Sequence, residues 1–443
     1  MQFAVFLITI LGHVALWIGA LNRLHSMAIP RRPMAAMSIV CLAMMGPVPI
    51  VAVCWWFAGG SRAFAALGPD ARVPLLACPA VLWAIFIYAA ICWAAGTTTF
   101  ARWLCFQCFR RRPQLIRLHA KRRMPVNLAA AALSAEENVH HLSVHLPGNE
   151  ALRLDLVEWS LDVPRLPAQL DGLTIAHISD LHFTGIVGKA FFREVVRACN
   201  ELKPDLVAIT GDLVDKSNCI SWIPEILGRL TARYGVYAVL GNHDLRVDET
   251  QLRKAIAGGG LVDLGGRWLE IDIRGETVIL AGNELPWFPP AADLGECHPR
   301  RDCPNFCGHR AGTDANALVG VVGKNGTVPL VARSPERGQL RIVLSHSPDQ
   351  LAWARAYDAD LMLSGHTHGG QIRIPPAGPI FSPSISGVKY DRGVFYEPPT
   401  ILHVTCGISG KQPWRWNCPP EIALLTLRAA GASATSAASE SRH

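Results

Sequence analysis

Acidic side chains are almost absent from the first 135 residues, where Asp70 stands alone against thirteen lysines and arginines. That stretch has a formal charge of +12 within a chain of +7, so the remainder carries about −5. A nucleic-acid-binding domain needs a basic patch on its folded part, and the acidic remainder argues against one. We therefore expect no nucleic-acid partner.

A disulfide framework is also missing. The thirteen cysteines are odd in number and scattered, and several lie in apolar stretches where Cys behaves as a small hydrophobe. Cys105 and Cys108 form a C-x-x-C pair, but no second pair lies nearby. The pair by itself does not select among a metal site, a redox site and a lipidation site.

Charged residues are absent from three long stretches, 1–22, 33–61 and 73–101. Each exceeds the roughly 20 apolar residues that cross a bilayer. Buried helices of a soluble domain are the alternative, but three such runs joined by short arginine-bearing loops are rare there. The first run lacks the positive start and the cleavage site of a signal peptide. The sequence predicts an all-α transmembrane region of about three helices, near 3–22, 35–58 and 74–100.

A basic cluster follows the third stretch, with seven lysines and arginines between 110 and 123. Positive residues flanking membrane helices favour the cytoplasmic side. We therefore predict a multi-pass protein of the cell (inner) membrane whose catalytic part is cytoplasmic. The same cluster could also hold anionic lipid headgroups.

Composition divides the chain into four parts. Residues 1–123 form the membrane region with its basic flank, and 124–150 read as a linker. From about residue 151 to 428, short apolar strands alternate with amphipathic helices, which indicates an α/β domain. Residues 429–443 are rich in Ala and Ser and are predicted to be disordered.

Five predicted strands of this domain end in short polar motifs. In chain order these are Asp180-Leu181-His182, Gly211-Asp212, Gly241-Asn242-His243-Asp244, Ser345-His346-Ser347-Pro348 and Gly365-His366-Thr367-His368. Sites in α/β sheets form outside the carboxyl ends of strands, so these loops can meet in one crevice.

The side chains in these motifs are typical metal ligands. Three offer oxygen and four offer imidazole nitrogen: Asp180, Asp212, Asn242, His182, His346, His366 and His368. Such a mixed set suits Mn²⁺, Fe or Zn²⁺ better than Ca²⁺ or Mg²⁺. Seven ligands are too many for one ion but fit two divalent ions that share a carboxylate.

The ordered series D-L-H, G-D, G-N-H-D, S-H-S-P and G-H-T-H resembles the calcineurin-like metallophosphoesterase family over roughly residues 165–427. The resemblance implies a four-layer α/β/β/α sandwich. The H-T-H-G-G-Q run, together with Gly387-Val388-Lys389-Tyr390, the stretch around Gly407 and Arg415, is similar to a membrane-associated branch. That branch includes lipid-A-pathway pyrophosphatases and transmembrane proteins with a metallophosphoesterase domain.

The resemblance also implies roles for the matching residues. One ion would be held by Asp180, His182, Asp212 and His368, and the other by Asp212, Asn242, His346 and His366. His243 would protonate or stabilise the leaving oxygen, with Asp244 orienting it. The nucleophile would be a metal-bound hydroxide. Asp215 and His177 are left outside the site, as a turn cap and a core or supporting imidazole.

One segment departs from the family pattern. The insertion near 288–338 is rich in Pro and Gly and holds three cysteines and two histidines, Cys297, His298, Cys303, Cys307 and His309. Their spacing is not a standard zinc pattern, so a structural zinc site and a long loop near the mouth of the site both stay open.

These observations predict a membrane-anchored phosphoesterase that hydrolyses a phosphoester or pyrophosphate bond, with the anchor favouring a lipid-linked substrate and a role in lipid metabolism. A phosphodiesterase acting on a soluble, nucleotide-type substrate is the alternative. A non-catalytic scaffold is a third reading, but it conflicts with the complete ligand set.

Overall fold

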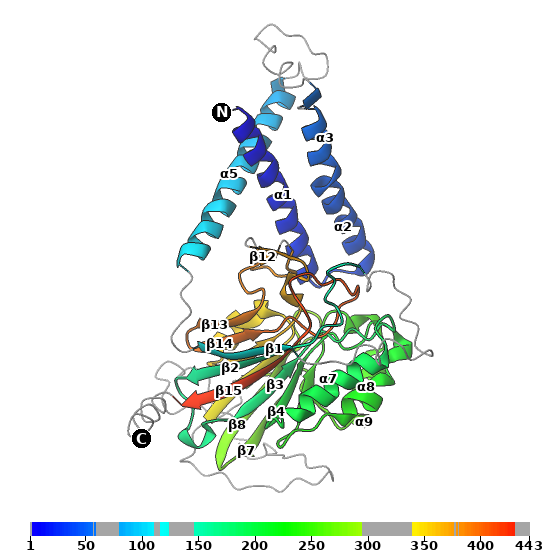
Figure 1. Cartoon of the computed structure of the whole chain (residues 1–443), viewed down its shortest axis with the longest axis vertical. Helices are drawn as coiled ribbons and strands as arrows, with labels where there is room; N and C mark the ends of the chain where they lie inside the picture. The colour runs from blue at the N-terminus through cyan, green and yellow to red at the C-terminus, as the bar shows by residue number, and fades with distance from the viewer. Residues whose placement is uncertain are drawn as a thin grey trace. The chain divides into compact units, whose positions relative to one another are not determined.

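The computed structural model describes residues 2–55, 57–58, 79–109, 116–123, 146–294, 339–375, 378–379 and 381–429. The chain separates into two compact units, Met1–Arg111 and Arg112–His443 (Figure 1). The Cys and His residues of the predicted insertion, residues 124–145 of the predicted linker and the tail from residue 430 lie outside the described residues.

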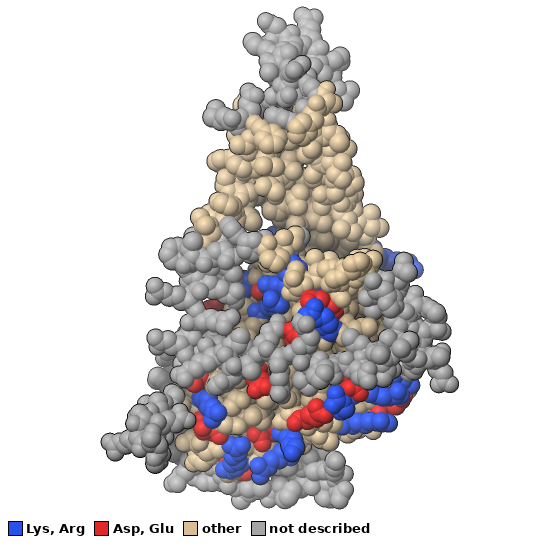
Figure 2. Space-filling view, in the orientation of Figure 1, with Lys and Arg blue, Asp and Glu red and all other residues tan. Residues whose placement is uncertain are grey.

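The first unit consists of apolar helices: α1 (Gln2–Ser26), α2 (Arg31–Met45), α3 (Pro47–Trp55) and α5 (Pro79–Phe109). The ranges Phe3–Ser26 and Arg32–Trp55 are long and apolar enough to cross a membrane, and α5 carries a shorter apolar stretch, Ile87–Ala101. Figure 2 shows almost no charged side chain on the described part of these helices. Such helices, apolar on their exposed faces, are typical of membrane spans.

The described helix α5 spans Pro79–Phe109 and ends later than the predicted helix near 74–100. Cys105 and Cys108 therefore lie within its last turns and not after it. Within this unit α1 lies against α5, where the His13 Nδ1 and Tyr88 hydroxyl oxygen are 2.6 Å apart. Glycines allow the close approach, because a Cβ at Gly12 would lie 1.7 Å from the Cys92 carbonyl oxygen.

The second unit is a mixed α/β domain built on two main sheets. The larger has the order β1-β2-β15-β3-β4-β5-β6 and the smaller β13-β14-β10-β9-β8-β7. The larger sheet comprises β1 (Ile116–Arg123), β2 (Asp155–Val163), β3 (Thr174–Ile178), β4 (Leu206–Thr210), β5 (Val236–Val239), β6 (Val262–Asp263) and β15 (Glu421–Ala429). The smaller comprises β7 (Trp268–Ile273), β8 (Glu276–Asn283), β9 (Gln339–Ser345), β10 (Leu361–Ser364), β13 (Gly393–Glu397) and β14 (Thr400–Val404).

The central strands of each sheet run parallel: β3, β4, β5 and β6 in the larger sheet, and β8, β9, β10 and β14 in the smaller. Four helices accompany them, α7 (Lys189–Glu201), α8 (Trp222–Ile226), α9 (Glu249–Gly258) and α10 (Leu351–Ala356). The described residues also form a short ribbon of β11 (Arg373–Ile374) and β12 (Gly378–Pro379). Parallel pairing brings the carboxyl ends of the central strands in each sheet to one edge.

Strand alternation explains how the core forms. In β3, Ile175 joins an apolar cluster shared by both sheets, which also contains Leu361 and Ile401 of the smaller sheet. The next residues, Ala176 and Ile178, point the other way and join the cluster formed with helices α7, α8 and α9. Both faces of the strand are thus buried, as is usual for central parallel strands.

The basic flank contains a strand that the sequence analysis did not foresee. Residues 116–123 form β1, which pairs antiparallel with β2 at the edge of the larger sheet. Its sequence, IRLHAKRR, holds four cationic residues. Positive charge on an edge strand discourages pairing with another chain. This part of the flank therefore belongs to a sheet of the second unit.

Candidate metal centre

The described strand ends deliver all seven predicted ligands to one edge. Asp180 and His182 follow β3, Asp212 follows β4, and Asn242 follows β5. His346 follows β9 of the smaller sheet, and His366 and His368 follow β10. Five of the seven have left-handed backbone, with φ between 46° and 69°: Asp180, His182, Asp212, His366 and His368. Non-glycine residues adopt this conformation at a cost, which is commonly retained at functional sites.

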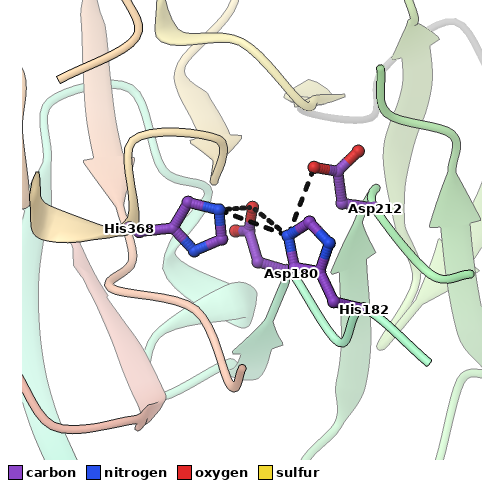
Figure 3. Close-up of side chains that lie close together, drawn as sticks. All are labelled: Asp180, His182, Asp212 and His368. Atoms are coloured by element: carbon purple, nitrogen blue, oxygen red, sulfur yellow. Dashed lines mark hydrogen bonds and ion pairs between the residues drawn. The ribbon is translucent and has the colours of Figure 1, made fainter. Parts of the chain in front are cut away.

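One group of ligands contains Asp180, His182, Asp212 and His368, whose ligand atoms lie within 4.8 Å of one another (Figure 3). His182 Nε2 is 3.4 Å from Asp212 Oδ2 and 3.2 Å from His368 Nε2. His368 Nε2 is also 3.5 Å from Asp180 Oδ1. These are the four residues expected to hold the first ion.

A second group contains Asp212, His346 and His366. His346 Nε2 lies 3.3 Å from Asp212 Oδ2 and 3.2 Å from His366 Nδ1. Asn242 Oδ1 is 3.1 Å from the same His346 nitrogen. Asp212 is common to the two groups, as a carboxylate that bridges two ions must be.

The hydrogen bonds at the site leave ligand nitrogens free to bind cations. His182 Nδ1 donates to Asp215 Oδ2 at 2.7 Å, and His346 Nδ1 donates to the Thr210 carbonyl oxygen at 2.7 Å. In each neutral ring the proton is then on Nδ1, so Nε2 presents its lone pair to other acceptors. Converging lone pairs repel one another unless a positive charge lies between them. Two carboxylates, an amide oxygen and four imidazoles therefore suit divalent metal ions.

Neighbouring charges shift the pKa values of two of these side chains. Burial alone would lower the pKa of His346, but the carboxylates of Asp212 and Asp180 outweigh it and raise that pKa to about 9. Burial likewise opposes the charged form of Asp212, yet His346 and His243 hold its pKa well below the usual range. The site is thus organised around positive charge at this position.

Asp215, and not Asp244, is the carboxylate beside His243, which corrects the expected orientation. Asp215 Oδ1 accepts a hydrogen bond from His243 Nδ1 at 2.6 Å, and its other oxygen accepts from His182. Asp244 is fully buried and accepts instead from backbone N–H groups of Leu213, Val214 and Gly241 at 2.8–3.0 Å. Asp215 thus orients two imidazoles, whereas Asp244 fixes the loops that carry Asp212 and Asn242.

The signal for Asp215 lies in its spacing from the ligands. It stands three residues after Asp212, and a β-bridge between Phe183 and Val214 brings the segment after His182 alongside it. Sequence alone showed the spacing but not the bridge.

His243 lies beside the predicted metal ligands and is not one of them. Burial lowers its pKa to about 4, although Asp212 and Asp215 oppose the shift. Its Nε2 is 3.3 Å from Arg246 Nη2, and the other end of that guanidinium pairs with Asp215. Arg246, whose side chain is 19% exposed at this position, was not predicted as a site residue.

Trp287 forms an apolar wall that the sequence analysis also missed. Its ring centroid lies 5.0 Å from that of His366 and 5.6 Å from that of His346. It is almost fully buried and restricts the rotation of both imidazoles. No local pattern marks it, because the contact joins loops far apart in sequence.

The loop of His366 and His368 is supported by two buried cysteines. Cys418 Sγ lies 3.2 Å from the His368 carbonyl oxygen, and a Cβ at Gly369 would lie 2.6 Å from Cys418 Sγ and 3.0 Å from Cys406 Sγ. With φ at +59°, this position needs glycine for both space and backbone. His177, by contrast, contacts His403 and Thr210 in the core and supplies no ligand.

A cluster of imidazoles and carboxylates at the carboxyl ends of strands in a mixed α/β domain defines a metal-dependent hydrolase site. Residues 173–370 match the model of the calcineurin-like phosphoesterase family, and this chain belongs to that family. It is accordingly a metallophosphoesterase, a hydrolase acting on phosphoester bonds, and members of this family bind divalent metal ions. The family expected from the sequence is confirmed.

Three relatives illustrate the match. The UDP-2,3-diacylglucosamine pyrophosphatase LpxG of Chlamydia trachomatis is 30% identical over 305 residues, covering 63% of this chain and 90% of the relative. The phosphodiesterase YaeI of Escherichia coli is 28% identical over 257 residues, covering 57% and 81%. The transmembrane protein with metallophosphoesterase domain of Danio rerio is 29% identical over 236 residues, covering 52% and 48%.

Proposed function

We propose that this chain hydrolyses a phosphoester or pyrophosphate bond in a lipid-linked substrate at a membrane, using two divalent ions. The convergence of seven ligand side chains around Asp212 carries the proposal of two ions. The apolar helices and the transmembrane relative support a membrane protein. The name of LpxG, which describes action on a diacylglucosamine nucleotide, supports a lipid-linked substrate.

The residues would act in the roles expected from the sequence, with one change. Asp180, His182, Asp212 and His368 would hold one ion, and Asp212, Asn242, His346 and His366 the other. Mn²⁺, Fe and Zn²⁺ all suit this donor set. Bound there, the ions would supply an activated water as the nucleophile and neutralise charge on the phosphoryl group.

His243 would be the general acid and Asp215 its positioning residue. Asp215 holds the Nδ1 edge at 2.6 Å, so Nε2 is directed away from that carboxylate. Negative charge on a bound phosphate next to Nε2 raises the pKa of His243 and favours the imidazolium. The proton on Nε2 would then pass to the leaving oxygen. Arg246, beside the same nitrogen, would bind the phosphate.

The proposal includes the architecture expected from the sequence. A four-layer α/β/β/α body would be held at the cell membrane by three helices, α1, α2 with α3, and α5. The basic segment after α5 would place that body in the cytoplasm.

The decisive experiment is hydrolysis by the full chain, purified in detergent and supplied with Mn²⁺. A UDP-diacylglucosamine and a soluble phosphodiester would be compared for the wild type, Asp212→Ala and His243→Ala. Glu201→Gln, which changes an exposed carboxylate on α7, is the matched control. Turnover of the lipid nucleotide that both site variants lose supports the proposal.

Two other outcomes would change it. Turnover of the soluble diester alone would favour the phosphodiesterase alternative, to which the similarity with YaeI also points. No metal-dependent turnover of either substrate would favour a scaffold.

A further inference from the structure

The described residues of the second unit expose large apolar side chains in a few segments that neighbour the metal centre. Among its described residues, the large apolar side chains that are 40% or more exposed are Leu146, Leu245, Ile372, Ile374, Ile385, Val388 and Trp414. We call these seven residues the apolar rim. Single exposed hydrophobes are normal on any protein surface, so their location, and not their number, is the informative feature.

The members of the rim lie in short segments connected to the metal centre, with Ile374 in β11. Leu245 stands between Asp244 and Arg246. Ile372 follows the ligand loop directly and bridges to Trp416, two residues after Trp414. Trp416 Nε1 in turn donates to the Pro147 carbonyl oxygen at 3.2 Å, which places Leu146 next to this loop.

The segment of Ile385 and Val388 is joined to the same loops at both ends. Asp349, three residues after His346, accepts from the Ser384 hydroxyl at 2.7 Å and from the Ile385 N–H at 2.9 Å. On the other side, the Thr367 hydroxyl donates to the Asp391 carbonyl oxygen at 2.7 Å. The rim therefore lies in segments that neighbour the ligand loops.

The charge on these loops complements an anionic surface. No Asp or Glu occurs from residue 372 to 390 or from 406 to 420. Lys389 and Lys411 are exposed within those segments. In Figure 2 the acidic side chains that are visible gather mostly lower on the second unit. Lys389 also pairs with Glu397, whose Oε1 lies 2.9 Å from the ammonium nitrogen. Exposed apolar side chains, a tryptophan and lysines are typical of surfaces that insert at a lipid headgroup boundary.

The short segment between α5 and β1 limits how far the second unit can lie from a membrane that the helices cross. Six residues, 110–115, separate the end of α5 at Phe109 from the start of β1 at Ile116. Such a segment spans at most roughly 25 Å when fully extended. If the helices of the first unit cross a membrane, the second unit cannot move far from its surface. A second protein is not needed to bring the rim to lipid.

We propose that the apolar rim docks on the surface of the bilayer, so that the metal centre faces the boundary between lipid and water. The rim's side chains would enter the headgroup region, with Lys411 beside anionic headgroups. This inference rests on the proposed membrane association and does not depend on which substrate is hydrolysed. It explains how a phosphate group held at the level of the headgroups could reach the ligands without leaving the membrane.

Photo-cross-linking of the full chain tests the contact directly. A photoreactive benzoylphenylalanine would replace Ile374 or Trp414 of the rim in separate variants, and exposed Lys254 of α9 in the control. Each variant would be reconstituted in vesicles of phosphatidylethanolamine and phosphatidylglycerol and irradiated. Lipid adducts would be quantified by mass spectrometry. We expect adducts at both rim positions to exceed those at Lys254 at least about tenfold.

The outcomes separate this inference from the proposed membrane anchoring. Failure of the wild type to incorporate into vesicles would overturn the anchoring. Incorporation with equal adducts at rim and control positions would overturn the docking, as would adducts with protein alone, which would mean that the rim is an interface with a second chain. Thermal unfolding of each variant checks that it folds, and Ile385 provides a further position if one of them does not.

Discussion

At the scale of single residues, Asp215 and not Asp244 contacts His243, and we therefore propose Asp215 as the residue that positions this imidazole. Both follow ligands of the metal groups, but only Asp215 touches imidazoles, those of His182 and His243. Asp244 bonds to three backbone N–H groups and is a structural carboxylate. Replacing Asp215 therefore removes contacts with two imidazoles, whereas replacing Asp244 removes hydrogen bonds to the backbone.

Asp215→Asn is expected to lower kcat by roughly 100-fold, because the amide cannot accept from both imidazoles and one of them loses its orientation. The control is Asp171→Asn, which changes a carboxylate remote from the ligands. Steady-state hydrolysis of a soluble diester with saturating Mn²⁺ measures the effect. A kcat equal to that of the wild type would show that Asp215 does not position His243.

Arg246→Ala is expected to raise KM about tenfold with a smaller change in kcat, because the guanidinium supplies binding energy to the phosphate in both ground and transition states. Arg246→Lys should recover part of the loss, since it keeps the charge but not the fork. Initial rates over a range of substrate concentrations separate the two constants. A pure loss of kcat would instead indicate that Arg246 acts through His243.

At the scale of elements, strand ends and the turns after them create the site. The five left-handed ligand residues turn their side chains inward immediately after β3, β4 and β10. The loop after β10 must also pass over two thiols, which leaves space only for glycine at position 369.

Gly369→Ala is expected to destabilise the unit by about 2–4 kcal/mol and to weaken Mn²⁺ binding, since strain of the left-handed backbone adds to overlap with Cys418. Gly387→Ala is a matched control, because its φ is +60° but no atom lies within 4 Å of the added Cβ. It should cost about 1–2 kcal/mol and leave Mn²⁺ affinity unchanged. Thermal unfolding and calorimetric titration provide the two readouts, and equal effects of both variants would refute the steric account.

At the scale of the whole molecule, the two main sheets meet through a pair of buried histidines beneath the metal centre. His177 of β3 and His403 of β14 approach with their Nδ1 atoms 2.8 Å apart. Burial lowers the pKa of His403 to about 3, and burial together with His403 lowers that of His177 well below its usual value. These shifts favour the neutral form of both rings in the folded chain.

This pair is expected to make stability fall with acidity. The unfolded chain takes up protons near pH 6.5, whereas the folded one does not, so the stabilisation is complete above that pH and is lost as the pH falls. The loss is at most about 1.4 kcal/mol per pH unit for each imidazole. Thermal unfolding of the wild type and of His403→Gln between about pH 7 and about pH 5 measures it. Equal slopes for the two proteins would contradict the prediction.

Much of the fold and of the candidate site could be predicted because it depends on local sequence patterns. Apolar runs without charge indicated the helices of the first unit, and the strand ends indicated all seven ligands that the structure brings together. Parallel pairing then places such loops at one edge whatever the details of packing. The start and end of α5 were less certain, because helix ends depend on weak local preferences.

The sequence by itself determined the family and the candidate metal ligands, since each motif follows its own strand and needs no distant partner to be recognised. Only the tertiary structure decided which carboxylate contacts His243, that Trp287 covers two imidazoles, that Arg246 enters the site and that exposed apolar side chains lie in segments that neighbour it. Those features are contacts between loops far apart along the chain. Their geometry depends on how the two sheets pack, which no local pattern encodes.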